Sequence, residues 1–100
     1  LAILAADMIV AGPGSLYTSV MPNLLVPEIT QAVQASRGIK VYICNIATQP
    51  GETTGYDVGD HVRAIERHTA RGTFQYVIAN DTFDAKPPPG GASDWVRLPA

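Results

Sequence analysis

The sequence predicts an α/β fold, built on an open parallel sheet with helices on both faces and present here as a partial β-α-β-α-β unit. Three observations predict this fold. Short continuous apolar runs recur along the chain, segments with apolar residues at helical spacing separate them, and each run ends in small or polar residues. Apolar runs without alternation are typical of strands covered on both faces. Strand–helix–strand connections of this length join parallel strands through right-handed crossovers, so the expected arrangement is Rossmann-like.

The three expected strands are the apolar runs 8–11, 40–46 and 74–79. The first run, MIVA, stops at Gly12-Pro13-Gly14. The second, KVYICNI, leads into a long polar segment, and the third, FQYVIA, ends in Asn80-Asp81. Glycine, proline and asparagine are common where strands end, so these boundaries favour three separate strands.

The first crossover is expected to contain a helix within residues 22–38. Ile29, Ala32 and Val33 recur there at helical spacing. Gly38 offers the left-handed conformation that ends many helices. Pro27 is expected to kink this helix, because proline lacks the N–H that an internal turn requires.

The second crossover is expected to be a helix that begins after Asp57. Aspartate is a favourable N-cap, because its side chain accepts hydrogen bonds from the free N–H groups of the first turn. The residues expected on the apolar face of this helix are Val58, His61, Val62 and Ile65. Residues 1–6 are expected to be the last turns of an earlier helix.

Length and composition indicate one partial α/β domain over residues 1–100. The chain has 100 residues, of which 46% are hydrophobic and 16% are charged, and this balance excludes an intrinsically disordered tract. Residues 85–100 are expected to form an irregular tail, since their Pro/Gly-rich beginning suits neither a helix nor a central strand. Because the sequence starts at Leu1 without an initiator Met, we expect part of a longer protein.

Charge and cysteine content restrict the partners and the location. The formal net charge is -2 and neither sign forms a long run, so we expect no nucleic acid partner and no membrane surface. No apolar stretch approaches the roughly 20 residues that span a bilayer. A single cysteine, Cys44, cannot form an internal disulfide, which favours a reducing cytoplasm.

Small and polar side chains follow all three expected strands. The carboxyl ends of parallel strands meet at one edge of a sheet, where ligands of open α/β sheets bind. The segments GPGSLYTS, NIATQPGETTGY and NDTF should therefore converge there. We expect a ligand site on this rim.

The turn after the first strand is a candidate phosphate cradle. Gly12 and Gly14 allow close approach of the backbone to an anion, and the hydroxyls of Ser15 and Thr18 can donate to phosphate oxygens beside the start of a helix. The motif is neither a complete GxGxxG, since Tyr17 takes the place of the third glycine, nor a P-loop. The alternative is a tight strand-to-helix turn with capping hydroxyls.

The loop after the second strand is a candidate site for a sugar or a base. It runs for twelve residues, 45–56, which is long for such a connection. Its amide, hydroxyl and carboxylate groups suit sugar hydroxyls or a base edge, and Tyr56 could stack on a ring. The polar residues concerned are Asn45, Thr48, Gln49, Glu52, Thr53 and Thr54. The alternative is a solvated loop with an ordinary turn at Pro50-Gly51.

The sequence indicates no catalytic residue and no metal site. His61 lies on the apolar stripe of its helix, so a packed core histidine is the simpler interpretation. Ser15 has no histidine placed by sequence as its base. Cys44 falls in the middle of a strand and is expected to be buried and inert.

Three strings, ADMIVAGPGSLYTSVMPNLLVPEI, KVYICNIATQPGETTGYDVGDHV and YVIAND, resemble the YvcK-type branch of the YvcK/CofD-like family, also called gluconeogenesis factors. The resemblance spans about residues 1–89. It implies the C-terminal part of a longer, cytoplasmic bacterial nucleotide-binding protein that binds a nucleotide sugar, UDP-N-acetylglucosamine, or another phosphate-bearing small molecule. It further implies that the protein supports growth on gluconeogenic carbon sources and affects cell shape. It implies no cofactor and does not require catalysis. The protein could form a homo-oligomer.

The resemblance also assigns ligand-facing positions. Phosphate binding falls to Gly12, Gly14, Ser15 and Thr18; nucleotide-sugar binding falls to Asn45, Thr48, Gln49, Gly51, Glu52, Thr53 and Tyr56. The alternative within the family is a CofD-like 2-phospho-L-lactate transferase of deazaflavin coenzyme biosynthesis, for which the same loops would position the substrate. CofD itself carries a different sequence in place of GPGSLYTS.

Overall fold

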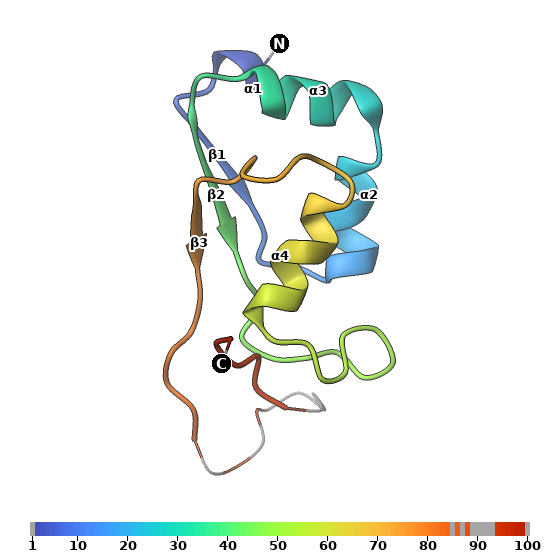
Figure 1. Ribbon diagram of the computed structural model, residues 1–100, viewed down its shortest axis with the longest axis vertical. Coiled ribbons are helices and arrows are strands. Elements are labelled where there is room, and N and C mark those ends of the chain that lie inside the picture. Colours follow the sequence, from blue (N-terminus) through green and yellow to red (C-terminus); the bar gives the residue numbers. More distant parts are fainter. Residues whose placement is uncertain (1, 85, 87, 89–93, 100) are drawn as a thin grey trace.

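The computed structural model describes residues 2–84, 86, 88 and 94–99. Three strands and several helices alternate along this part of the chain (Figure 1). In order, the elements are α1 (Ala2–Ala5), β1 (Met8–Ala11), the π-helix η1 (Leu16–Val20), α2 (Met21–Leu24), α3 (Pro27–Ala35), β2 (Ile39–Ile43), α4 (Val58–Glu66) and β3 (Tyr76–Ile78).

The strands form one three-stranded parallel sheet in the order β1-β2-β3. Val10 of β1 pairs with Val41 of β2, and Val41 pairs with Tyr76 of β3. The predicted α/β class and parallel sheet are therefore confirmed. Since the strands are parallel, their carboxyl ends lie at the same end of the sheet, and the glycine turn and the second loop both start there (Figure 1).

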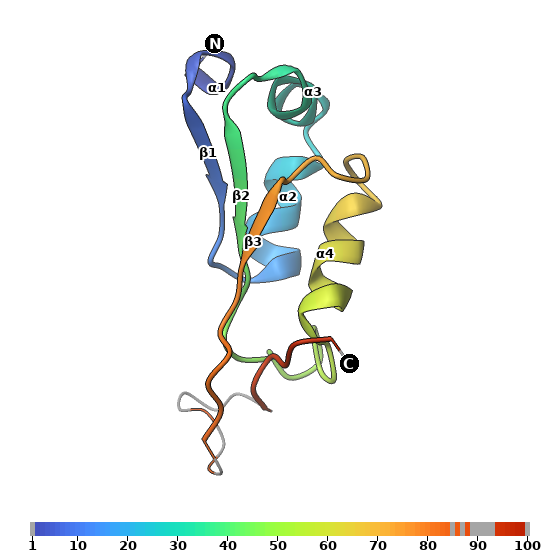
Figure 2. The same ribbon diagram turned by 60° about the vertical axis from the view of Figure 1, so that its left-hand side comes forward.

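The helices α2, α3 and α4 all lie on one face of the sheet (Figures 1 and 2). A doubly wound sheet has helices on both faces because its strand order reverses at a switch point. Here the strand order runs in one direction, and successive right-handed crossovers then bring their helices to the same face. Within the described residues, the expectation of helices on both faces is met on one face only.

The opposite face of the sheet is apolar and exposed. Cross-strand partners share a face, and Met8, Val10, Ile39, Val41, Tyr76 and Ile78 occupy alternate positions on this one. Val41, in the central strand, is buried between its neighbours at 7% exposure, whereas the other five side chains are exposed. Their relative exposures lie between 46% for Ile39 and 61% for Tyr76. The expectation that the first strand is covered on both faces is thus wrong for the described part of the chain, because only the helical side is covered.

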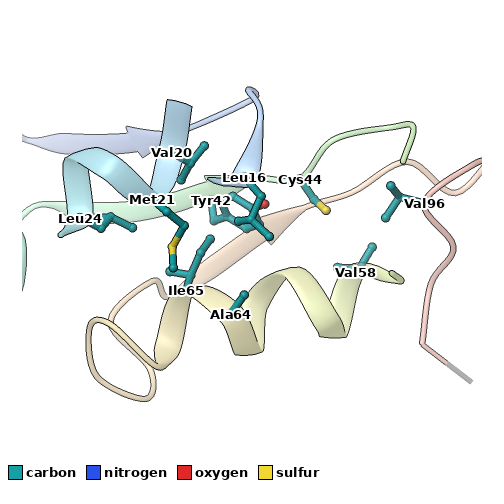
Figure 3. Packing of buried hydrophobic residues seen from close by; sticks show 10 residues of the cluster. All are labelled: Leu16, Val20, Met21, Leu24, Tyr42, Cys44, Val58, Ala64, Ile65 and Val96. Atoms are coloured by element: carbon teal, nitrogen blue, oxygen red, sulfur yellow. The ribbon is translucent and has the colours of Figure 1, made fainter. Parts of the chain in front are cut away.

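The core lies between the sheet and the helices, where side chains from η1, α2, β2 and α4 meet (Figure 3). Tyr42 and Cys44 contribute from the second strand and its end, and Ile65 contributes from α4. Burial raises the pKa of the Cys44 thiol to about 11. The thiol therefore stays protonated near neutral pH, as expected for a buried and inert cysteine.

The first crossover differs from the single kinked helix expected. Pro27 does not kink a helix; it is the first residue of α3, where the missing N–H has no helical partner to lose. Helix α3 ends at Ala35, before Gly38, which has no left-handed backbone. A Cβ at Gly38 would lie 2.5 Å from the carbonyl oxygen of Ala6, so this glycine permits close chain packing instead.

The second crossover helix agrees closely with its prediction. Asp57 caps α4, since its side chain accepts from the N–H of Asp60 at 2.8 Å. The Asp60 side chain in turn accepts a hydrogen bond from the N–H of Asp57 at 2.9 Å, and the two bonds together form a capping box. The bond from the Asp57 backbone holds the pKa of Asp60 below its ordinary value, and Arg63 adds to this effect. His61 is fully buried, as expected for a core histidine.

The described part of the tail is irregular but contributes to the core. Val96 is buried within the hydrophobic cluster, and Trp95 forms an isolated antiparallel bridge with Ala47. The rest of the predicted tail, residues 85, 87, 89–93 and 100, lies outside the described residues. Among the described residues, no helix has both the length and the apolar character needed to cross a membrane.

Candidate functional site

The glycine turn passes close to the end of β2. Gly12 has φ +84°, and a Cβ there would lie 2.5 Å from the carbonyl oxygen of Ile43. Both observations require glycine, because other residues strain at positive φ and would collide with the neighbouring backbone. The turn is therefore built to bring the strand end against its neighbour.

A reciprocal hydrogen-bonded pair joins the turn to the second loop. The N–H of Gly14 donates to Asn45 Oδ1 at 3.0 Å, and Asn45 Nδ2 donates to the carbonyl of Gly14 at 2.8 Å. One amide side chain thus satisfies both backbone groups of Gly14. The pair fixes the separation of the two loops at the rim of the sheet.

A second link connects the same loops nearer to solvent. Ser15 Oγ donates to Glu52 Oε1 at 3.1 Å and accepts from the N–H of Thr18 at 3.4 Å. Ser15 is in this way the N-cap of η1, and the Thr18 side chain is exposed. Glu52 is also exposed, so its carboxylate can turn away from Ser15 without leaving a buried charge.

The middle of the second loop is held by internal bonds. Thr53 Oγ1 accepts from the N–H of Gln49 at 2.8 Å, and Thr48 Oγ1 bonds to the backbone of Asp94 at 3.0 and 3.2 Å. Thr48 and Thr53 are buried, with relative exposures of 2% and 0%. These two predicted ligand residues support the loop from inside, because threonine carries a methyl group suited to the core and a hydroxyl that can bond backbone.

The end of the second loop carries a cluster of three rings. The hydroxyls of Tyr17 and Tyr56 lie 2.7 Å apart, and their rings meet edge to face with centroids 6.4 Å apart. The His61 ring packs edge to face against the Tyr56 ring, with the ring centroids 5.6 Å apart and an interplanar angle of 86°. The hydrogen bond to Tyr56 raises the pKa of Tyr17 above its ordinary value, so this phenol is protonated at neutral pH.

The rim thus brings together most of the predicted residues. Of these, the glycine turn and the second loop meet through Gly14, Ser15, Asn45 and Glu52, and Tyr56 stands at the same rim. Gly51 is exposed at the turn of the loop, with φ +80°. Tyr17 also lies at this rim but was not among the predicted contact residues; its position two residues after Ser15 was the signal for it. Asn80 bonds to Thr82 within its own turn.

A groove of about 420 Å³ opens beside the glycine turn, at the edge of β1. Gly12 and Gly14 are among the residues that line it, together with apolar side chains of β1, α2 and α3 such as Ile9, Leu24 and Val33. This volume falls within the range of small-molecule sites. The polar rim and the groove are therefore continuous at the turn.

Replacing Asn45 with alanine is expected to lower the free energy of unfolding by about 1–3 kcal/mol, because both backbone groups of Gly14 lose their partner. Denaturant unfolding measures the loss. Asn23→Ala is the matched control, since its single exposed bond to Ser19 should contribute no more than about 1 kcal/mol. Equal losses in the two variants would contradict a bracing role for Asn45.

Comparison with known proteins identifies the family. A family model described as 2-phospho-L-lactate transferase CofD matches residues 1–88. The chain is 52% identical over 75 residues to the gluconeogenesis factor of Bacillus subtilis (strain 168), covering 75% of this chain and 24% of that protein. It is 52% identical over 90 residues to the gluconeogenesis factor of Halalkalibacterium halodurans, covering 85% of this chain and 28% of that protein.

A solved structure agrees with these matches. The crystal structure of a member of the UPF0052 family from Bacillus halodurans superposes with a TM-score of 0.80 at 51% identity, over 84% of this chain and 27% of that one. The chain thus spans between 24% and 28% of the length of the two gluconeogenesis factors compared. Because the family model matches most of the sequence, the chain belongs to the CofD family, and it is similar to proteins named gluconeogenesis factors.

Proposed function

We propose that this chain forms part of a nucleotide-sugar-binding regulatory protein of the gluconeogenesis factor type, with UDP-N-acetylglucosamine as its ligand. The observation that carries the proposal is the joining of the glycine turn to the second loop through the Gly14–Asn45 and Ser15–Glu52 contacts. Two loops at a fixed separation suit a ligand with two chemically different parts, a diphosphate and a sugar nucleoside.

The diphosphate would bind at the glycine turn. Ser15 Oγ already donates to an anionic oxygen of Glu52, which is the kind of bond a phosphate oxygen accepts. A bound phosphate would take the place of this carboxylate, and Glu52 would turn toward sugar hydroxyls. Gly12 keeps the backbone close, and Thr18 offers a second exposed hydroxyl.

The sugar nucleoside would lie along the second loop. Gln49, Gly51 and Glu52 provide an amide, a bare backbone and a carboxylate there, and Tyr56 offers a half-buried ring for stacking. Thr48 and Thr53 would act from inside the loop by holding its shape. In this proposal the protein is cytoplasmic, needs no cofactor, and influences carbon metabolism and cell shape through its ligand-bound state; self-association into a homo-oligomer is compatible with it.

Calorimetry of the complete polypeptide with UDP-N-acetylglucosamine tests the proposal. We expect saturable binding, and we expect Tyr56→Ala to weaken it by roughly 1–3 kcal/mol through the loss of ring stacking. Tyr76→Ala, on the open sheet face, is the control and should bind as the parent does. A folded protein that binds nothing at millimolar ligand would rule the proposal out.

The second candidate function is transfer of a phospholactyl group, as the name of the matching family model describes. The same loops would then position a nucleotidyl-activated 2-phospho-lactate so that an acceptor hydroxyl attacks the phospholactyl phosphorus in line and the nucleoside monophosphate leaves. Mass spectrometry of an acceptor incubated with the activated donor distinguishes the two functions. A product carrying the transferred group above background would favour the transferase, whereas binding without transfer favours regulation.

A further inference from the structure

The glycine turn places a second tyrosine against Tyr56. Tyr17 lies in η1, directly after the segment that carries Gly14 and Ser15, and is 39 residues from Tyr56 in sequence. Their hydroxyls are 2.7 Å apart, and the two rings meet at 78°. This contact joins the first loop to the far end of the second.

The Tyr56 ring has a rigid neighbour on the protein side. His61 is fully buried, and its Nδ1 lies 2.8 Å from the carbonyl oxygen of Asp57. A carbonyl oxygen only accepts, so Nδ1 carries the proton and donates it. This bond, at the first turn of α4, fixes the orientation of the imidazole that Tyr56 contacts edge to face.

The remaining freedom of Tyr56 is at its hydroxyl end. A tyrosine on a loop loses rotational entropy when a ligand stacks on it, unless the ring is already held. The backbone of Tyr56 is held by its N–H, which donates to the carbonyl of Thr53 at 2.9 Å. The bond to Tyr17 restrains the opposite end of the same residue.

We propose that Tyr17 is a positioning residue, which holds the Tyr56 ring in its binding orientation through the hydrogen bond between their phenols. The inference rests on the proposed function, since it concerns how that site takes the planar group of a nucleotide ligand. Tyr17 acts on Tyr56 and does not itself touch the ligand. The site is therefore prepared before the ligand arrives, and the glycine turn controls the geometry of the second loop.

Binding to UDP-N-acetylglucosamine is measured for Tyr17→Phe, Tyr56→Phe and the double variant in the complete polypeptide. Phenylalanine keeps each ring and removes only the hydrogen bond. We expect each single variant to bind about fivefold more weakly, and the double variant to lose no more than either single one. Tyr76→Phe, an exposed phenol on β3, is the matched control and should bind as the parent does.

A measurement without ligand separates this inference from the proposed function. In protein with isotope-labelled tyrosine, the NMR signals of the Tyr56 ring should shift or broaden in ligand-free Tyr17→Phe, while those of buried Tyr42 stay in place. If the parent binds no nucleotide sugar, the proposed function fails, but these signals still decide whether Tyr17 positions the ring. Unchanged Tyr56 signals would overturn the inference, and so would a double variant about 25-fold weaker, because each hydroxyl would then act independently.

Discussion

Replacing Gly12 with alanine is expected to lower the free energy of unfolding by about 3 kcal/mol and to disrupt the rim of the sheet. Positive φ at a residue with a side chain costs on the order of 1–3 kcal/mol. Here the new Cβ would also lie 2.5 Å from the carbonyl oxygen of Ile43, which belongs to rigid strand backbone. Because this contact can be relieved only if β1 or β2 moves, we expect the glycine turn to shift. Denaturant unfolding measures the stability loss.

Gly72→Ala is the matched control for Gly12→Ala. Gly72 has a similar φ, +79°, but no atom lies within 4 Å of the Cβ that alanine would add. We expect a loss of about 1 kcal/mol, from backbone strain alone. If the two variants were equally stable, the close approach of Gly12 to β2 would contribute nothing.

Replacing Leu16 with alanine is expected to cost about 2–5 kcal/mol of stability, since it opens a cavity in the core. Leu16 is 0% exposed and belongs to the hydrophobic cluster that holds η1 against β2 and α4 (Figure 3). It follows Ser15 directly, so we also expect weaker hydrogen bonding from Ser15 to Glu52. Thermal unfolding gives the stability loss.

Leu25→Ala provides the comparison for Leu16→Ala. Leu25 is 56% exposed and follows α2 at the surface. Its truncation should change stability by less than about 1 kcal/mol. A loss as large as that of Leu16→Ala would mean that the core does not anchor the glycine turn in the way the packing indicates.

The sequence was sufficient to predict those elements that are stabilised by contacts between neighbouring residues. Asp57 and Asp60 cap each other within one turn, so the start of α4 could be predicted from a few residues. Pro27 was ambiguous, because proline both interrupts a helix and begins one. The single π-helical turn at Leu16–Val20 had no sequence rule to reveal it.

The open sheet face shows the limit of an apolar run as a signal. The run MIVA predicts that both faces of a strand will be covered, but it does not say which part of the polypeptide covers them. The described helices cover one face and leave Met8 and Val10 exposed on the other. In the compared gluconeogenesis factors, more than two thirds of the length lies outside the match, so those proteins have further chain available for such a face.

The candidate site could be located from the sequence, but its internal bonding could not. Parallel strands predicted that three segments meet at one rim, and two of them, the glycine turn and the second loop, are joined there by hydrogen bonds. In the third segment, Asn80 bonds to Thr82 within its own turn and Phe83 packs against Trp95. Asn45 was expected to face a ligand, and the structure adds its bonds to Gly14, 31 positions away in the sequence. Thr48 was expected to contact a nucleotide sugar, and its hydroxyl bonds to the backbone of Asp94, 46 positions away in the sequence. Such distant contacts depend on tertiary packing, which residue type alone does not encode.

A crystal structure of the complete polypeptide bound to UDP-N-acetylglucosamine tests most directly whether the two joined loops form one ligand site. We expect diphosphate oxygens within hydrogen-bond distance of Ser15 Oγ, Glu52 turned away from that hydroxyl, and a planar part of the ligand against Tyr56. An ordered ligand that touches neither the glycine turn nor the second loop would contradict this account.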